Sequence, residues 1–135
     1  MPLLQGKRIF YVEDDLRNRA IVQMIVEQHG ARLSFERWGK EAVAKMRASL
    51  PIDLILLDIM LPNNVNGYDI YAQLRQDSAF DGIPIAIVSA SDASLEMTKA
   101  RQLGLDGYIA KPIDMDLFPR QLAHLIAGEQ VWYAG

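Results

Sequence analysis

The chain has 135 residues, no cysteine and a formal net charge of −3, and half of its residues are apolar. This length suits one domain with a core, the weak acidic charge gives no basic surface for nucleic acid, and the absence of cysteine excludes disulfides and thiolate metal sites. The sequence shows neither a leader nor an uncharged stretch that could span a bilayer. We therefore expect a soluble, cytoplasmic protein that binds no nucleic acid and no membrane.

Short apolar runs alternate with longer segments of helical period. The expected strands are 8–13, 32–36, 53–58, 84–88 and 108–110. The first and third are apolar between their charged end residues, and the fourth is apolar throughout, which is typical of strands covered on both faces of a sheet. This alternation predicts an α/β domain: a doubly wound, five-stranded parallel sheet of the flavodoxin-like order 2-1-3-4-5, with five helices.

The first expected helix follows the acidic cluster Glu13-Asp14-Asp15 and ends before Gly30, which suits the C′ position. We predict that its buried face carries five apolar residues at helical spacing: Leu16, Ala20, Ile21, Met24 and Ile25. The second and third helices, 40–49 and 68–76, have shorter inward faces. These faces consist of Ala42, Val43 and Met46 in the second helix and of Tyr71 and Leu74 in the third.

The fourth expected helix, 92–103, has Ser91 as its N-cap. Charged residues interrupt its weak apolar stripe, so we expect it to be the most loosely packed helix. The stripe consists of Leu95, Ala100 and Leu103. The fifth helix is expected to begin near Leu117, because with Asp116 as N-cap Pro119 lies at N3, where no intrahelical donor is lost.

The chain is expected to form one domain, residues 1–127, and a short tail, 128–135, with no output domain. The tail contains an apolar cluster, Val131-Trp132-Tyr133, that either packs back on the domain or meets a partner. We favour packing back. Without an output domain, regulation has to act through another protein, unless the chain belongs to a longer one.

Acidic residues close two of the apolar strands. Glu13 and Asp14 follow the first strand, and Asp58 follows the third. In a sheet of the predicted order, ligands bind beyond the carboxyl ends of these two strands, where the winding direction reverses. Carboxylates gathered there repel one another, which raises their pKa values unless a positive charge offsets them. The pattern predicts a cation or phosphate site with oxygen ligands.

Three further residues complete a family motif: Ser89 after the fourth strand, and Lys111 and Pro112 after the fifth. With these, about residues 7–127 resemble a response-regulator receiver domain, the phosphoacceptor module of two-component signalling. The resemblance implies that Asp58 accepts a phosphoryl group from a sensor histidine kinase or a phosphotransfer protein, in a Mg²⁺-dependent step. It also implies a cis bond between Lys111 and Pro112.

The resemblance also implies the ligands of the ion: Asp14, Asp58 and the backbone carbonyl of Met60, with Glu13 acting through water. Mg²⁺ prefers about six oxygens in near-octahedral geometry and retains waters, so this set suits it. In phosphoryl transfer the protein mainly positions the reacting groups and places positive charge against the equatorial phosphoryl oxygens. Asp58 is then the nucleophile. Lys111 supplies charge to the phosphoryl oxygens, and Ser89 donates a hydrogen bond to them.

Tyr108 is a candidate switch residue. In resembling proteins an aromatic at this position turns inward when the acceptor is phosphorylated, coupled to the hydroxyl at Ser89. The alternative is an aromatic that fills an edge strand. If the switch operates, the surface of the fourth helix, fifth strand and fifth helix changes shape, and a downstream protein reads it. A homodimer is also among the assemblies that the resemblance allows.

Each residue has a plainer interpretation. The acidic triplet can cap the following helix and place favourable charge at its N-terminus, and we assign Asp15 to that role. Three site residues can be ordinary turn, surface or cap residues: Asp58, Lys111 and Ser89. His29 and His124 lie beside no predicted strand end or second ligand, so we interpret them as helix-surface residues.

Two other function classes stay open. A Mg²⁺-dependent phosphatase or phosphotransferase with an Asp-x-Asp signature needs a second acid two residues after the nucleophile, where this chain has Met60. A binding module is either a receiver that works unphosphorylated or a flavodoxin-like nucleotide binder, which needs a glycine-rich loop where this chain is acidic. We therefore expect a phosphoacceptor that is not a turnover enzyme on an external substrate.

The loop after Asp58 departs from the family pattern. Eight residues separate Asp58 from Gly67, one more than usual, so we expect segment 63–66 to be longer or bulged. Met60 is apolar, and Ser91 offers no carboxylate to orient water. We hypothesise that the phosphoryl group is comparatively long-lived.

Overall fold

A computed structural model describes residues 2–135, so residue 1 of the expected domain lies outside the described part. Within residues 2–135 six parallel strands form one sheet with the order β2-β1-β3-β4-β5-β6. The strands are β1 (Arg8–Val12), β2 (Arg32–Glu36), β3 (Leu54–Leu57), β4 (Ile85–Ser89), β5 (Gly107–Ala110) and β6 (Val131–Tyr133). The doubly wound parallel sheet is confirmed. The prediction of five strands is wrong, because a sixth strand follows the last helix.

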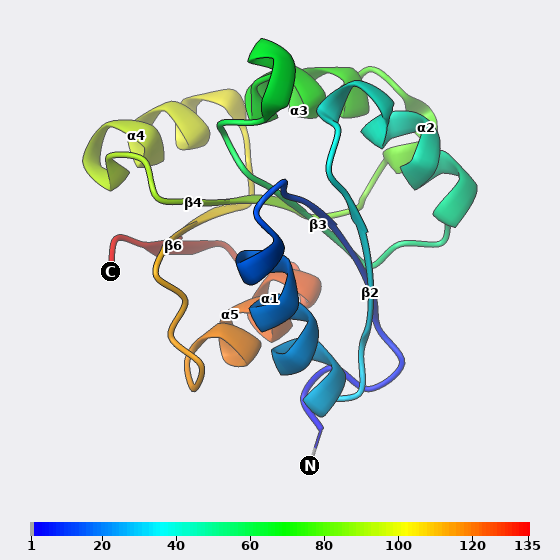
Figure 1. Ribbon diagram of the computed structural model, residues 1–135, viewed down its shortest axis with the longest axis vertical. Helices are drawn as coiled ribbons and strands as arrows, with labels where there is room; N and C mark the ends of the chain where they lie inside the picture. The colour runs from blue at the N-terminus through cyan, green and yellow to red at the C-terminus, as the bar shows by residue number, and fades with distance from the viewer. Residues whose placement is uncertain (1) are drawn as a thin grey trace.

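The same range contains five α-helices and two short 3-10 helices. The α-helices are α1 (Leu16–Gln28), α2 (Gly39–Ser49), α3 (Gly67–Arg75), α4 (Ala93–Leu103) and α5 (Phe118–Ile126), and the 3-10 helices are η1 (Pro62–Asn64) and η2 (Ser78–Phe80). In Figure 1, α1 and α5 cover one face of the sheet and α2, α3 and α4 cover the other. None of the helices within residues 2–135 combines the length and the hydropathy that a membrane-spanning helix requires.

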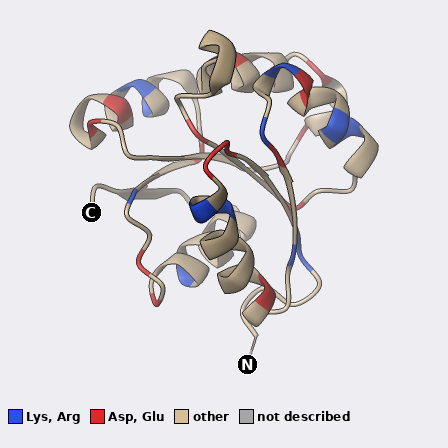
Figure 2. Cartoon of the chain, viewed as in Figure 1, with Lys and Arg blue, Asp and Glu red and all other residues tan. Residues whose placement is uncertain are grey.

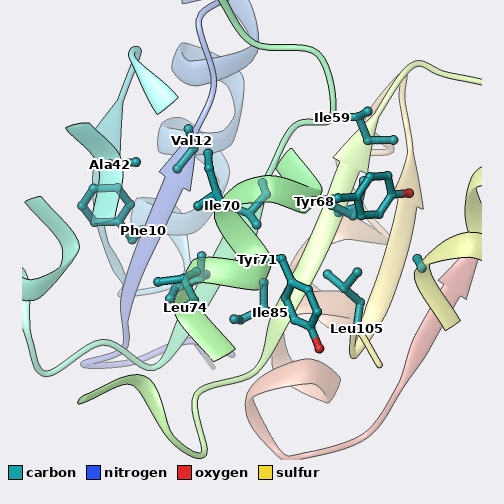
Figure 3. Packing of buried hydrophobic residues seen from close by; sticks show 14 of the residues in the cluster. Phe10, Val12, Ala42, Ile59, Tyr68, Ile70, Tyr71, Leu74, Ile85 and Leu105 are labelled. Carbon is teal, nitrogen blue, oxygen red and sulfur yellow. The ribbon is translucent and has the colours of Figure 1, made fainter. Parts of the chain in front are cut away.

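The two faces of the sheet bury separate apolar layers, because successive side chains of a strand point to opposite faces. Phe10 and Val12 of β1 belong to the layer under α2, α3 and α4, whereas Ile9 and Tyr11 belong to the layer under α1 and α5. Figure 3 shows the first layer, with side chains of α3 packed against those of the strands. Burial on both faces explains why β1, β3 and β4 are apolar.

The buried face of α1 differs from the predicted one. Its buried residues are Val22, Ile25 and Val26. The predicted residues Leu16, Ile21 and Met24 are 67%, 39% and 42% exposed, and Ala20 is exposed as well. Two apolar stripes run along this helix, and a 3.6-residue period does not tell which of them faces the core. Gly30 has a φ of 88°, as expected of a C′ glycine.

The second and third helices bury the predicted residues, with Val43 partly buried. In α4 the N-cap is Asp92, whose Oδ1 accepts the Ser94 N–H at 3.0 Å, so the prediction of Ser91 as cap is wrong. Within α4, all of which is described, Ala100 is the one buried residue. Leu95 is 71% exposed, and α4 buries the fewest residues of the five helices, as expected of the most loosely packed one.

The start of α5 lies within one residue of the predicted one, but the prediction of Asp116 as its N-cap is wrong. The helix begins at Phe118, and its N-cap position is Leu117, which makes no side-chain capping bond. Asp114 instead closes the turn before the helix, because its Oδ1 accepts the N–H groups of Asp116 and Leu117, both at 2.9 Å. Pro119 still lies in the first turn, where its missing N–H leaves no intrahelical bond unmade.

Strand β6 lies in the segment that was expected to be a tail. It pairs in parallel with β5, so that Tyr108 is opposite Trp132. Gly107 makes room for this pairing, because a Cβ at that position would lie 2.5 Å from the Val131 carbonyl oxygen. The Arg101 guanidinium of α4 stacks over the Trp132 ring at 4.7 Å from its centre. The apolar cluster therefore packs back on the domain as expected, and it does so as a strand.

We predict that Gly107→Ala weakens the attachment of β6. The added Cβ forces β5 and β6 apart, and overpacking of this kind costs about 1–3 kcal/mol. Urea unfolding measures the total loss, and hydrogen exchange measures the protection of the β6 amides. Leu95→Ala, which shortens an exposed side chain, is the control and should change stability by less than about 0.5 kcal/mol. Wild-type protection of β6 in Gly107→Ala would refute the role assigned to this glycine.

Candidate functional site

The carboxyl ends of β1 and β3 lie side by side and bring three acids together. Glu13 and Asp14 follow β1, and Asp58 follows β3. The Asp58 N–H donates to the Val12 carbonyl at 3.1 Å, which fixes the two strand ends relative to each other. A carboxylate oxygen from each acid lies within 4.8 Å of the other two. In Figure 2 acidic residues colour the turn that leads from the sheet into α1.

Lys111, directly after β5, extends into this acidic cluster. Its Nζ lies 3.0 Å from Glu13 Oε1 and 3.1 Å from Asp58 Oδ2. Its backbone N–H donates to the Ser89 carbonyl at 2.9 Å, and its peptide bond to Pro112 is cis. The Glu13 and Lys111 side chains are only 1% and 10% exposed, so this ion pair is largely withdrawn from bulk water.

These contacts change the protonation of the site. Burial, and then contact with the Asp58 carboxyl, raise the pKa of Glu13 to about 7. Burial acts to lower the pKa of Lys111, but the Asp58 and Glu13 carboxylates outweigh it and raise that pKa. Burial also raises the pKa of the Tyr11 hydroxyl, and the charge of Glu13 adds to this effect. Lys111 is therefore charged at neutral pH and faces more carboxylates than it can neutralise.

The two oxygens of Glu13 have different surroundings. Oε1 accepts hydrogen bonds from Lys111 and from Asn18 Nδ2, the latter at 2.9 Å. Oε2 is buried and has no hydrogen-bond partner among the described residues. A buried carboxylate oxygen without a partner is costly unless an ion or a water meets it. The donors are all oxygens, so the three acids fit a hard divalent cation such as Mg²⁺.

Ser89, the last residue of β4, and Tyr108 of β5 both contact Ser91 in the loop between β4 and α4. The Ser89 hydroxyl donates to Ser91 Oγ and accepts the Ser91 N–H, both at 3.3 Å. Tyr108 is fully buried, and its hydroxyl donates to the Ser91 carbonyl at 3.1 Å. A cavity of about 230 Å³ opens beside them, far larger than the roughly 10–15 Å³ that one water needs. It is lined by Asp58, Met60, Ser89, Ala90, Ser91 and Lys111.

The loop after Asp58 is held close to the Asp58 carboxylate. Asp58 Oδ1 accepts the Ile59 N–H at 2.7 Å. Asn63 and Asn64, in η1, have φ values of 62° and 59°, a left-handed conformation that asparagine tolerates better than most residues. A single bridge between Met60 and Asn66 closes this loop, so the additional residue is accommodated in a 3-10 turn.

Sequence reasoning missed two residues beside the site. Gly67, the first residue of α3, packs so closely on the Asp58 carbonyl that a Cβ there would collide with it. Asn18 contacts Glu13 from the first turn of α1. Its position in that turn could have indicated this contact from the sequence, because helical side chains point back toward the N-terminus. Asp15 caps α1 as interpreted, with its Oδ1 accepting the N–H groups of Arg17 and Asn18 at 2.8 and 3.2 Å.

The histidines lie outside the acidic cluster. His29 is the C-cap residue of α1, and its N–H donates to the Val26 carbonyl at 3.1 Å. His124 Nδ1 lies 2.9 Å from Glu129 Oε2 on the exposed side of α5. Among the described residues, the one group of three or more potential metal ligands is Glu13, Asp14 and Asp58.

Comparison with known proteins gives consistent matches. The model of the response regulator receiver domain matches residues 9–123. Protein PilH from Pseudomonas aeruginosa is 28% identical over 121 residues, which are 90% of this chain and 98% of PilH. The polar-differentiation response regulator DivK from Brucella ovis is 34% identical over 112 residues, which are 83% of this chain and 89% of DivK. The chain spans about half the length of several other curated relatives.

A solved structure resembles this one closely. It is the receiver domain of the sensor histidine kinase PA1611 from Pseudomonas aeruginosa PAO1, with a magnesium ion coordinated in its active-site cleft. The TM-score is 0.78 at 26% identity, over 90% of this chain and 98% of that one.

We predict that the metal-free chain loses stability as the pH rises from about 5 to about 7. The pKa of Glu13 is about 7 in the folded chain against an ordinary value of 4.5, so the folded chain keeps a proton that the unfolded chain has released. This contribution is complete below pH 4.5, is lost as the pH passes 7, and amounts to at most about 3 kcal/mol.

Urea unfolding in the presence of a chelator, repeated across this pH range, measures the effect. Glu13→Gln should remove the slope, and Glu27→Gln, which changes an exposed acid of α1, should keep it. An identical slope in wild type and Glu13→Gln would show that Glu13 is not its source.

Proposed function

Because the chain belongs to the response regulator receiver domain family, we propose that it accepts a phosphoryl group on Asp58 in a Mg²⁺-dependent step of a two-component phosphorelay. A sensor histidine kinase or a phosphotransfer protein donates the group. The observation that carries this proposal is the contact of one lysine, Lys111, with both Glu13 and Asp58 at the cavity. Neither a turn residue nor a solvated surface lysine requires that arrangement.

Asp58 acts as the nucleophile. One of its carboxylate oxygens bonds to phosphorus while the bond between phosphorus and the donor histidine nitrogen breaks, and the bonding electrons stay on that nitrogen. The Ile59 N–H and Lys111 hold the carboxylate in one orientation before the transfer. Lys111 and Ser89 both line the cavity beside Asp58, so they pair with the phosphoryl oxygens as these gain charge.

Asp14, Asp58 and the backbone carbonyl of Met60 would bind Mg²⁺, with Glu13 acting through water. The bound ion supplies positive charge to the phosphoryl oxygens. The spacing of the three acids and the partnerless Glu13 Oε2 support this assignment. So does the magnesium ion in the active-site cleft of the PA1611 receiver domain.

Phosphorylation would change the face formed by α4, β5 and α5, where a downstream protein binds. As Ser89 moves toward the phosphoryl group, Ser91 follows through its hydrogen bonds to Ser89, and Tyr108 is linked to Ser91 in turn. We assign the buried position of Tyr108 to the inward state of this switch. Because Ala100 is the one buried residue of α4, little core packing opposes a shift of this helix.

β6 covers the edge of β5 on the face where we expect a partner to bind. The strand pairs along β5, so the partner contacts α4, β6 and α5 rather than the edge of β5. Trp132 is half-buried there, with Arg101 of α4 stacked over it. A shift of α4 therefore moves the Arg101 guanidinium relative to the accessible Trp132 ring. A partner bound at β6 then meets a changed arrangement of these two side chains.

We predict that incubation with a small acyl-phosphate donor and Mg²⁺ adds one phosphoryl group, measured as a mass gain of the intact protein. Asp58→Asn and a chelator should each abolish the gain. Asp81→Asn, which changes an exposed aspartate of the same type, should retain it. Continued turnover of unrelated phosphoesters would favour an enzyme instead, and no gain in the wild type would favour a binding module.

We predict that the phosphoryl group is long-lived and that Met60→Asn shortens its lifetime several-fold. Met60 is 74% exposed and lines the cavity, where a thioether shields phosphorus and does not hydrogen-bond an attacking water, whereas an amide does. Loss of radiolabelled phosphate measures the lifetime, and Met24→Asn on α1 is the control. Decay within seconds that is unchanged or slower in Met60→Asn would contradict this prediction.

A further inference from the structure

Asn18 connects α1 to the acceptor site. Its Nδ2 donates to Glu13 Oε1 at 2.9 Å, and Lys111 Nζ donates to the same oxygen at 3.0 Å. The Asn18 backbone is fixed as well, because its N–H donates to the capping carboxylate of Asp15 at 3.2 Å. The capping turn thus places the side-chain amide of Asn18 against the buried carboxylate of Glu13, which follows β1.

Two donors on Oε1 determine where Oε2 points. A carboxylate is planar, so fixing one oxygen and its stem fixes the direction of the other. Glu13 is 1% exposed, and Oε2 is buried without a hydrogen-bond partner among the described residues. Because bulk water hardly reaches Glu13, it does not replace a lost donor at Oε1. Without Asn18, Lys111 alone would orient the carboxylate, and Lys111 also binds Asp58.

We propose that Asn18 is a positioning residue of the acceptor site, which holds Glu13 Oε1 so that Oε2 stays available to the divalent cation and its water. The inference rests on the proposed function and adds a residue to it. Asn18 acts through Glu13 and does not contact the reacting atoms. Residues that orient metal ligands in this way change metal affinity by about 10–100-fold when they are replaced.

Calorimetric titration with Mg²⁺ tests this role directly. Asn18→Leu keeps the approximate size of the side chain but removes the donor, so Mg²⁺ should bind about tenfold more weakly or worse. Gln23→Leu is the matched control, because it removes another amide of α1 that donates to a glutamate, Glu27, at 3.1 Å on the exposed surface. This control should bind Mg²⁺ as the wild type does.

Phosphorylation kinetics separate positioning from structural damage. At saturating Mg²⁺ the rate of phosphoryl gain in Asn18→Leu should return to that of the wild type, because only the affinity for the ion was lost. Thermal unfolding in a chelator confirms that the variant folds, and Asn18→Ala, which suits a helix, serves in its place if Leu prevents folding.

Two results overturn the inference: wild-type Mg²⁺ affinity in the folded variant, or slow phosphorylation that saturating Mg²⁺ does not restore. A wild-type chain that binds Mg²⁺ without gaining a phosphoryl group rejects the proposed function instead. The calorimetric comparison still decides the role of Asn18 in that case.

Discussion

The site depends on one buried ammonium group that two carboxylates share. Lys111 Nζ contacts Glu13 and Asp58 at 3.0 and 3.1 Å, and it does so after a strand that lies two places away from β3 in the sheet. Parallel strands make this possible, because their carboxyl ends meet at one edge and gather residues that are 98 positions apart in the chain. Three acids and one lysine leave an excess of negative charge in a cleft where water screens it poorly. That excess is the physical reason why we propose a cation at this edge of the sheet.

The parts of the fold and site that depend on local pattern were predictable. Apolar residues run without interruption through β1 after Arg8, through β3, and through β4 up to Ser89. The acids that follow β1 and β3 meet as soon as the strand order is assigned. β6 was not predictable in the same way. Its three residues form a strand only because Gly107, 24 residues earlier, leaves space for the Val131 carbonyl. Likewise, the sequence of α1 carries two apolar stripes, and packing against the sheet, which is not a local property, buries Val22 and Val26 instead of Leu16 and Ile21.

Side chains that support the site were harder to find than those that form it. Asp58 and Lys111 belong to residue types that signal chemistry, whereas Asn18 is an ordinary polar residue of a first helical turn, and Gly67 resembles a simple helix start. Their importance lies in distances: an amide 2.9 Å from a buried carboxylate, and a backbone with no room for a Cβ beside the Asp58 carbonyl. These two close contacts depend on where the first turns of α1 and α3 lie relative to the ends of β1 and β3. Such features emerge only once the relative placement of helices and strands is known.

The charge balance of the site explains why phosphorylation would be felt at a distance. Under the proposed function, three carboxylates are opposed by Lys111 and a divalent cation, which together balance them. Conversion of the Asp58 carboxylate to an acyl phosphate adds negative charge and further acceptor oxygens.

The fixed cations already have partners, so the nearest adjustable donor beside the cavity is the Ser89 hydroxyl, whose present acceptor is Ser91 Oγ at 3.3 Å. A bond of that length to a neutral oxygen is weaker than one to an ionised phosphoryl oxygen. The exchange of one for the other would release Ser91 Oγ. The Ser91 N–H would still donate to Ser89 Oγ and would draw along the loop that binds Tyr108 and leads into the lightly packed α4. Under the proposed function, a new hydrogen-bond acceptor at Asp58 would in this way change the face that includes β6.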